Sequence, residues 1–113
     1  MELGSFGALE PDEPFPGLER RTFDAAGATV NEYRFRPGAR FPVHSHVQEQ
    51  ITIVEEGDVE MTIGDEVRPM GAGDWSVVEG DVPHGIRAGD AGARIVAVIV
   101  PRRTSATAYV VHE

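Results

Sequence analysis

Apolar and polar residues alternate in short runs from residue 18 to the end of the chain, and turn-forming residues separate these runs. Alternation with a period of two is typical of β-strands that bury one face. Many short strands repeating about every eight to twelve residues are typical of a β-sandwich or β-barrel. No window of useful length has an apolar stripe with helical spacing, so we expect little or no helix. The pattern predicts an all-β fold.

The predicted strands are short, and several carry β-branched or aromatic residues on one face. They are Leu18–Thr22, Thr29–Arg36, Ala39–His46, Gln50–Glu56, Asp58–Ile63, Glu66–Met70, Trp75–Val78, Gly85–Arg87, Arg94–Ile99 and Ala108–Val111. Gly64-Asp65 predicts a two-residue hairpin turn. Glu56-Gly57 predicts a further turn between two strands.

Residues 1–17 differ from the rest of the chain, because they contain three of its eight prolines and three of its thirteen glycines. We expect an N-terminal arm there, either loosely ordered or used as an edge segment in a dimer. Residues 18–113 are expected to form a single domain, since a chain of 113 residues can bury one core.

Composition and charge exclude several classes of protein. Nineteen acidic residues against ten basic ones give a net charge of −9, the opposite sign from a nucleic-acid-binding protein. The chain has no cysteine, which excludes disulfides and thiolate metal sites. Its longest apolar run, Ile95–Val100, is far below the roughly 20 residues that span a bilayer, and Met1–Ser5 lacks signal-peptide features. We therefore expect a cytoplasmic protein without nucleic-acid or membrane partners.

The chain has four histidines, and two of them, His44 and His46, are two residues apart. On a strand their rings point to the same face, which lets both imidazoles bind one metal ion. Gln50 lies an even number of positions from both histidines, so on a continuous strand it would point to the same face. An unbroken strand would, however, place it about 13 Å from His46. If Gln50 is a ligand, the chain must therefore bend within Val47–Glu49. Otherwise Gln50 is a buried amide satisfied by neighbouring backbone groups.

Glu49 has the opposite parity from Gln50 and is expected to face away, unless a bulge reverses the two. The third histidine of interest, His84, begins a predicted strand after a tight turn. Pro83 keeps the residue before it extended, so His84 can point back towards His44 and His46 inside a barrel. We interpret His112 as a tail residue.

Two motifs in this sequence resemble the signature motifs of the cupin superfamily. The first is Gly38-x5-His44-x-His46-x3-Gln50-x6-Gly57, with glutamine where a glutamate is usual. The second is Gly73-x5-Glu79-x-Asp81-x2-His84-x3-Ala88, which keeps the histidine but departs from the family pattern at Glu79, Asp81 and Ala88. Together with the flanking strands, the resemblance covers nearly the whole chain.

The resemblance implies a double-stranded β-helix, which is a small jelly-roll barrel with one divalent metal ion near its mouth. The ligands that it implies are His44, His46, Gln50 and His84. Such a set suits zinc, nickel, iron, cobalt or manganese. Because glutamine is neutral, the site keeps a charge near +2, which favours an anionic ligand and Lewis-acid chemistry. It also lacks a ligand carboxylate that could act as a base during oxygen chemistry.

The variant with glutamine resembles cupins of pectin degradation, which linearise unsaturated uronates, and some polyketide-cyclase cupins. In the uronate family an aspartate and a phenylalanine on the last barrel strand precede Pro-x-Arg. The corresponding positions here are Ala97, Ile99 and Arg103, so the arginine is kept and the aspartate is lost. This departure argues against uronate ring opening itself.

Tyr33 and Arg103 are our candidates for catalytic residues. Tyr33 and Phe35 share one face of their strand, and Arg34 and Arg36 share the other. We expect the apolar pair to face the barrel interior, although an inward arginine would suit an anionic substrate.

We expect a metal-dependent enzyme that acts on a small, oxygenated or carboxylate substrate by isomerase, lyase or cyclase chemistry. The alternatives are a metal-dependent dioxygenase and a non-catalytic small-molecule binding or sensor protein. A homodimer is also expected, because small cupins commonly pair and because open sheet edges invite pairing.

Overall fold

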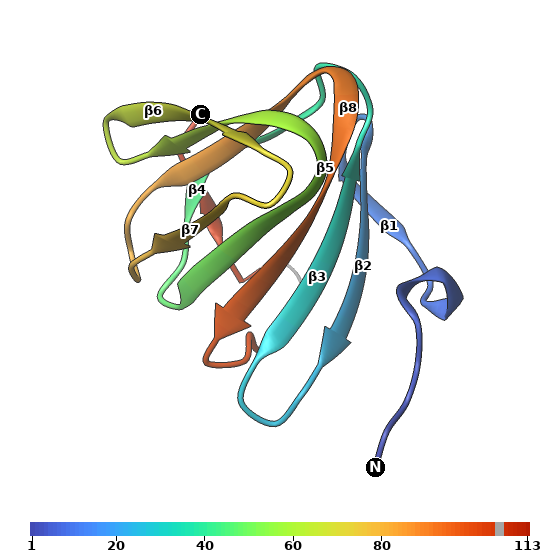
Figure 1. The fold of residues 1–113 in the computed structure, drawn as a ribbon. Coiled ribbons are helices and arrows are strands. Elements are labelled where there is room, and N and C mark those ends of the chain that lie inside the picture. Colours follow the sequence, from blue (N-terminus) through green and yellow to red (C-terminus); the bar gives the residue numbers. More distant parts are fainter. Residues whose placement is uncertain (106–107) are drawn as a thin grey trace.

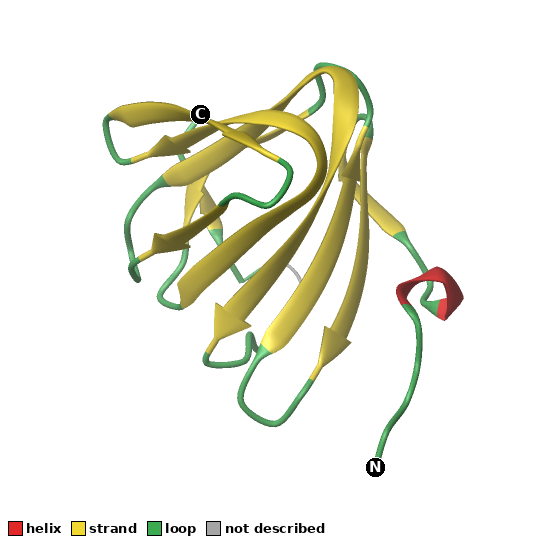
Figure 2. Ribbon diagram, in the orientation of Figure 1, coloured by secondary structure: helices red, strands yellow, loops and turns green. Residues whose placement is uncertain are grey.

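The computed structural model describes residues 1–105 and 108–113, and the regular secondary structure in these residues is almost entirely β-strand (Figures 1 and 2). One short 3-10 turn, η1, covers Phe6–Ala8. The strands are β1 (Asp12–Phe15), β2 (Leu18–Asp24), β3 (Thr29–Phe35), β4 (Arg40–Ser45), β5 (Glu49–Ile63), β6 (Glu66–Gly71), β7 (Trp75–Val78), β8 (His84–Val100) and β9 (Val110–Val111). In this part of the chain, no helix has the length and apolarity that crossing a membrane requires.

Two long antiparallel strands, β5 and β8, hold the fold together. They pair with each other over most of their length, and each also pairs with further strands on its other side. The C-terminal half of β8 lies against β3, with Ile95 opposite Tyr33, whereas its start lies against β4, with His84 opposite His44. The two strands therefore belong to both sides of a curled sheet that closes into a barrel, as Figure 1 shows. This is the predicted jelly-roll architecture.

The strand bounds correct the sequence-based prediction at two places. The predicted strands Gln50–Glu56 and Asp58–Ile63 form the single strand β5, and Gly85–Arg87 and Arg94–Ile99 both lie within β8. Glu56-Gly57 does not reverse the chain but forms an irregularity in the pairing of β5 with β8. A glycine with positive φ serves a bulge as well as a turn, so sequence alone did not separate the two.

Gly64-Asp65 does form the predicted hairpin turn, between β5 and β6, where Ile63 pairs with Glu66. Part of the predicted arm, residues 12–15, forms the edge strand β1, in which Asp12 pairs with Arg20 of β2. Residues 1–11 lie outside the sheet. Near them, Phe6 rests on Phe23 with ring centroids 5.7 Å apart.

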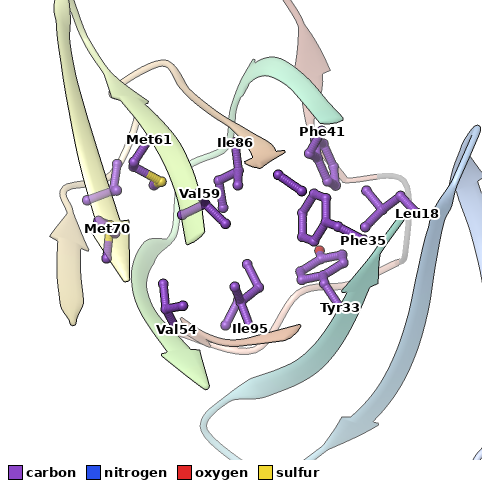
Figure 3. Packing of buried hydrophobic residues seen from close by; sticks show 13 residues of the cluster. Leu18, Tyr33, Phe35, Phe41, Val54, Val59, Met61, Met70, Ile86 and Ile95 are labelled. Carbon is purple, nitrogen blue, oxygen red and sulfur yellow. The ribbon is translucent and has the colours of Figure 1, made fainter. Parts of the chain in front are cut away.

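The core fills the interior of the barrel (Figure 3). Tyr33 and Phe35 point inward and are buried, whereas Arg34 and Arg36 are exposed. The expectation of an inward apolar pair is therefore confirmed, and neither arginine reaches the interior. Inward-facing polar residues gather at one region of the same interior. They are Arg20, Thr29, Asn31, His44, His46, Gln50, Thr52 and His84.

The bulge at Gly57 should tolerate no side chain. A Cβ added at Gly57 (φ +79°) would lie 2.1 Å from the carbonyl oxygen of Gly92, whereas a Cβ at Gly64 (φ +61°) would meet nothing within 4 Å. We expect Gly64→Ala to cost about 1 kcal/mol, the cost of a left-handed alanine. Gly57→Ala should cost about 3 kcal/mol or more, because the steric clash adds to that cost.

Chemical denaturation of both variants measures this difference. Equal losses in the free energy of unfolding would show that the close approach between β5 and β8 does not constrain the barrel.

Candidate metal centre

Three histidines from two separate parts of the chain meet inside the barrel. His44 lies near the end of β4, His46 follows this strand, and His84 begins β8 directly opposite His44. All three side chains are buried, and one ring nitrogen from each can be chosen so that the three lie within 4.8 Å of one another. The ring centroids of His44 and His84 are 4.2 Å apart, and those of His46 and His84 are 4.8 Å apart. The three residues could therefore hold one metal ion.

Backbone carbonyls select the tautomer of each imidazole. Each Nδ1 lies within hydrogen-bond distance of a carbonyl oxygen two residues away along the chain. These are the oxygens of Pro42 for His44 (2.8 Å), of Gln48 for His46 (3.0 Å) and of Val82 for His84 (2.9 Å). A carbonyl only accepts, so each Nδ1 carries the proton and each Nε2 keeps its lone pair. Metal-binding histidines are commonly oriented in this way.

Gln50 adds a fourth acceptor to the cluster. Its amide nitrogen donates to Thr52 Oγ1 at 3.0 Å, which leaves its Oε1 facing the imidazoles. This oxygen lies 3.1 Å from His46 Nε2 and 3.2 Å from His84 Nε2. Because the protons of the imidazoles are on Nδ1, both Nε2 atoms and Gln50 Oε1 are hydrogen-bond acceptors. These close contacts are therefore repulsive, and a bound cation would remove the repulsion. The donor set of nitrogen and oxygen atoms thus fits a divalent metal ion.

The electrostatics of the cluster keep the imidazoles neutral. Burial lowers the pKa of His44 to about 3 and the pKa of His84 to about 4. Burial also lowers the pKa of His46. The three rings are therefore uncharged at pH 7, the form in which imidazole binds metals.

The backbone around these residues follows the sequence-based expectations. The chain bends at Val47 and Gln48, so β5 starts afresh at Glu49. Glu49 is exposed and Gln50 is buried, which confirms the predicted parity. Among the described residues, the amide nitrogen of Gln50 donates to the side chain of Thr52 and to no backbone group. The fourth histidine, His112, is exposed and lies outside the cluster.

Both predicted catalytic residues, Arg103 and Tyr33, are buried. Arg103 follows β8, is only 6% exposed, and has its backbone nitrogen bonded to Thr29 Oγ1 at 3.0 Å. Its positive charge contributes to the lowered pKa values of His44 and His46, for which burial is the main cause. Among the described residues, Arg103 pairs with no carboxylate and its Nε finds no hydrogen-bond partner.

The hydroxyl of Tyr33 accepts a hydrogen bond from Asn31 Nδ2 at 3.3 Å and a further one from Arg20. Burial raises the pKa of Tyr33, and the positive charges of Arg103 and Arg20 oppose this rise. Two donors already occupy the hydroxyl oxygen, so the proton of Tyr33 is left to point towards another acceptor.

Sequence reasoning missed two residues near the site. Arg20 is buried and binds Asp12 through two hydrogen bonds, of 3.0 and 2.6 Å. Arg20 is two residues from Leu18, so strand alternation places both side chains on the inward face of β2. This alternation was the sequence signal that could have identified Arg20. Tyr109 lies with its ring 5.6 Å from that of His44 and 5.3 Å from that of Phe41. No sequence signal showed which part of the barrel Tyr109 covers.

A cavity of about 280 Å³ is lined by residues from the start of the chain, from β2 and from the segment after β8, and by none of the histidines. Its lining includes Arg20 and Thr22 of β2, Thr29 of β3, and Arg103. Arg103 therefore lines this cavity, and its charge also acts on His44 and His46.

Comparisons with known proteins agree with the fold and the cluster. The family model for the cupin domain matches residues 31–99, so this chain belongs to the cupin family. An RmlC-like cupin from Shewanella frigidimarina NCIMB 400 is 26% identical, with a TM-score of 0.83 over 92% of this chain and 95% of that one. KdgF from Halomonas sp. is 25% identical, with a TM-score of 0.80 over 90% and 97% of the two chains.

A variant of oxalate decarboxylase from Bacillus subtilis shares the fold, with a TM-score of 0.87, 22% identity, and coverage of 96% of this chain and 32% of that chain. A search of curated proteins finds no match to this sequence. The family, the fold and the three buried histidines together support a metal-dependent cupin.

Removal of a central imidazole should abolish metal binding. We expect His84→Ala or His44→Ala, purified and dialysed against metal-free buffer, to retain about a tenth or less of the wild-type metal content. His112→Ala is the matched control, because this histidine lies outside the cluster, and it should keep the full content. Elemental analysis measures all three, and equal metal in every variant would contradict the assignment.

The hydrogen bond from Gln50 to Thr52 should tune the affinity for the metal. Thr52→Val keeps the side-chain shape but removes the acceptor that orients the Gln50 amide. We expect the metal dissociation constant to rise about tenfold, as is usual when a group that orients a ligand is lost. Competition with a chromophoric chelator measures this constant, and an unchanged value would show that Gln50 Oε1 does not bind the metal.

Proposed function

We propose that this cupin is an enzyme that uses one divalent metal ion to act on a small anionic substrate by Lewis-acid, non-redox chemistry. The substrate class is an oxygenated or carboxylate compound, and the reaction is of the isomerase, lyase or cyclase type. The observation that carries the proposal is the ligand set itself. Three neutral imidazoles and one neutral amide leave the full positive charge of the ion available to an anion.

When bound, the metal ion would polarise the oxygen atoms of the substrate and stabilise negative charge on them. Its ligands would be His44, His46, Gln50 and His84. Arg103 supports the same substrate class, because a buried guanidinium without a carboxylate partner among the described residues is suited to bind an anion.

Proton transfer in this site is assigned to Tyr33. Among the described residues Glu32 is the only buried carboxylate, and it pairs with Arg34 at 3.0 Å and Arg94 at 3.8 Å on the outer face of the sheet. Ala97 and Ile99 are buried at the positions that correspond to the aspartate and phenylalanine of the uronate family. Neither side chain has an ionisable group, so neither can transfer a proton. Tyr33 is inside the barrel and has a hydroxyl oxygen already bound by two donors, so it can give its proton to a substrate oxygen.

The aromatic side chains next to His44 would limit access of water. Phe41 lies with its ring 4.0 Å from that of His44, and Tyr109 packs against both. Exclusion of water strengthens the electrostatic attraction between the site and an anionic substrate.

The reaction class is tested with metal-loaded protein and a panel of small hydroxy, oxo and unsaturated carboxylic acids. Proton NMR detects product, and an oxygen electrode follows the same reactions. We expect conversion without oxygen consumption. Oxygen uptake coupled to conversion would establish the dioxygenase alternative, and tight binding without product from any member would establish the binding or sensor alternative.

Arg103 should determine the affinity for anions. With malonate as the probe and metal-loaded protein, we expect Arg103→Gln to raise the dissociation constant by about tenfold or more, because a charge-assisted hydrogen bond is lost. Arg102→Gln is the matched control: Arg102 is exposed and lies 3.8 Å from Asp24. Calorimetry measures both variants. Equal affinities would remove Arg103 from the site.

A further inference from the structure

The cavity of about 280 Å³ beside β2 is lined only by polar and charged residues, among those that the structure describes. Three carboxylates, three guanidiniums and four hydroxyls line it. Ligand sites in proteins are normally lined mostly by apolar side chains, with a few polar groups that fix the orientation of the ligand. We therefore expect a ligand of this cavity to be recognised by its own charged and polar groups.

The two signs of charge lie at different depths in this cavity. Its floor is positive, because Arg20 and Arg103 are only 3% and 6% exposed. Its rim, the exposed part of the charged lining, carries three carboxylates and one guanidinium, which give it a net charge of −2. The rim residues are Glu10, Asp12, Asp24 and Arg102.

Arg103 is the floor guanidinium that is suited to receive a ligand. Arg20 already donates two hydrogen bonds to Asp12 and binds the hydroxyl of Tyr33. The Nε atom of Arg103, by contrast, is buried without a hydrogen-bond partner among the described residues. A buried cationic donor without an acceptor is costly, and a carboxylate is the group that satisfies a guanidinium best. The floor therefore suits one carboxylate group.

Thr29 connects the floor with the rim. Its hydroxyl accepts a hydrogen bond of 3.0 Å from the backbone nitrogen of Arg103 and donates one of 2.6 Å to Asp24 Oδ1. One hydroxyl group thus lies between the rim carboxylate of Asp24 and the residue that carries the floor guanidinium. A ligand that uses both charges suits this arrangement best when its own opposite charges are a few bonds apart, as in an α-amino acid.

Strand register places the cavity at the same end of the barrel as the metal ligands. Asp24 of β2 is opposite Thr29 of β3, Thr29 is opposite Ile99 of β8, and Ile99 is opposite Gln50 of β5. These four residues form one row, at the end of the barrel where β2 and β8 end and β3 and β5 begin (Figure 1).

We propose that this cavity binds the amino carboxylate group of an α-amino acid or of a compound derived from one. Its carboxylate binds Arg103 at the floor, and its ammonium group faces Glu10 and Asp24 at the rim. A simple anion must pass a rim of net charge −2, which repels it, whereas a ligand with an ammonium group is attracted by the same carboxylates. That such a compound is the substrate rests on the proposed function, but its binding in the cavity does not.

Three small molecules of matched shape test this proposal. L-Glycerate has a hydroxyl in place of the ammonium group of L-serine, and serinol has a hydroxymethyl group in place of its carboxylate. NMR titrations of the zinc-loaded protein measure the dissociation constants. We expect L-serine to bind about fivefold or more tightly than L-glycerate, and about tenfold or more tightly than serinol. Removal of zinc with a chelator should leave the constant for L-serine unchanged, because no histidine lines the cavity.

Variants assign the two preferences to the two parts of the cavity. Glu10→Gln combined with Asp24→Asn should make the constants for L-serine and L-glycerate equal, and Arg103→Gln should make those for L-serine and serinol equal. Glu13→Gln combined with Glu60→Gln is the matched control for the rim, because it removes two exposed carboxylates outside the lining. It should keep both preferences.

Equal binding of L-serine and L-glycerate by the wild type, or loss of L-serine binding when zinc is removed, would overturn the proposal. If L-serine does not bind but malonate still binds through Arg103, this proposal fails and the proposed function stands. If both preferences are found but no acid of the panel is converted, the cavity is an amino-acid site and the proposed chemistry is wrong. Where circular dichroism shows that a variant does not fold, the wild-type titrations decide the question alone.

Discussion

The central constraint in this molecule is the convergence of lone pairs at one point inside the barrel. Three backbone carbonyls hold the protons of His44, His46 and His84 on Nδ1, and the Thr52 hydroxyl turns the Gln50 oxygen towards the same point. Such an arrangement is costly without a cation, since buried acceptors that face one another have no donor to satisfy them. The barrel thus prepares a site whose geometry is set by the fold before any ligand arrives.

The jelly roll produces this convergence through the antiparallel pairing of its long strands. Pairing of β4 with β8 brings His44 opposite His84, although the two residues are forty positions apart in the sequence. The bend at Val47 and Gln48 then returns the chain so that β5 can place Gln50 next to both. Strand alternation determines which side chain of β5 faces the histidines. A shift of one residue in β5 would replace the amide of Gln50 with the carboxylate of Glu49.

Much of the fold and of the cluster could be predicted from the sequence, because both depend on local alternation and on two spaced motifs. Parity alone placed Gln50 inside and Glu49 outside, and turn chemistry identified the hairpin at Gly64-Asp65. Glu56-Gly57 was mistaken for a turn because a bulge and a turn use the same residues. For Arg20, strand alternation with Leu18 was an available signal of burial, but its contact with Asp12 was not predictable from alternation. The contact of Tyr109 with His44 joins distant segments, which no local pattern reports.

The segment after β8 carries two of the groups beside the cluster, Arg103 and Tyr109, and none of the four proposed metal ligands. A hydrogen bond from the backbone nitrogen of Arg103 to Thr29 Oγ1 ties this segment to β3. Under the proposed function, the strands of the barrel and the bend before β5 would hold the metal ion, and the segment after β8 would contact the substrate through Arg103. In that arrangement, a substitution in the segment after β8 would change the affinity for the substrate without removing any of the four proposed metal ligands.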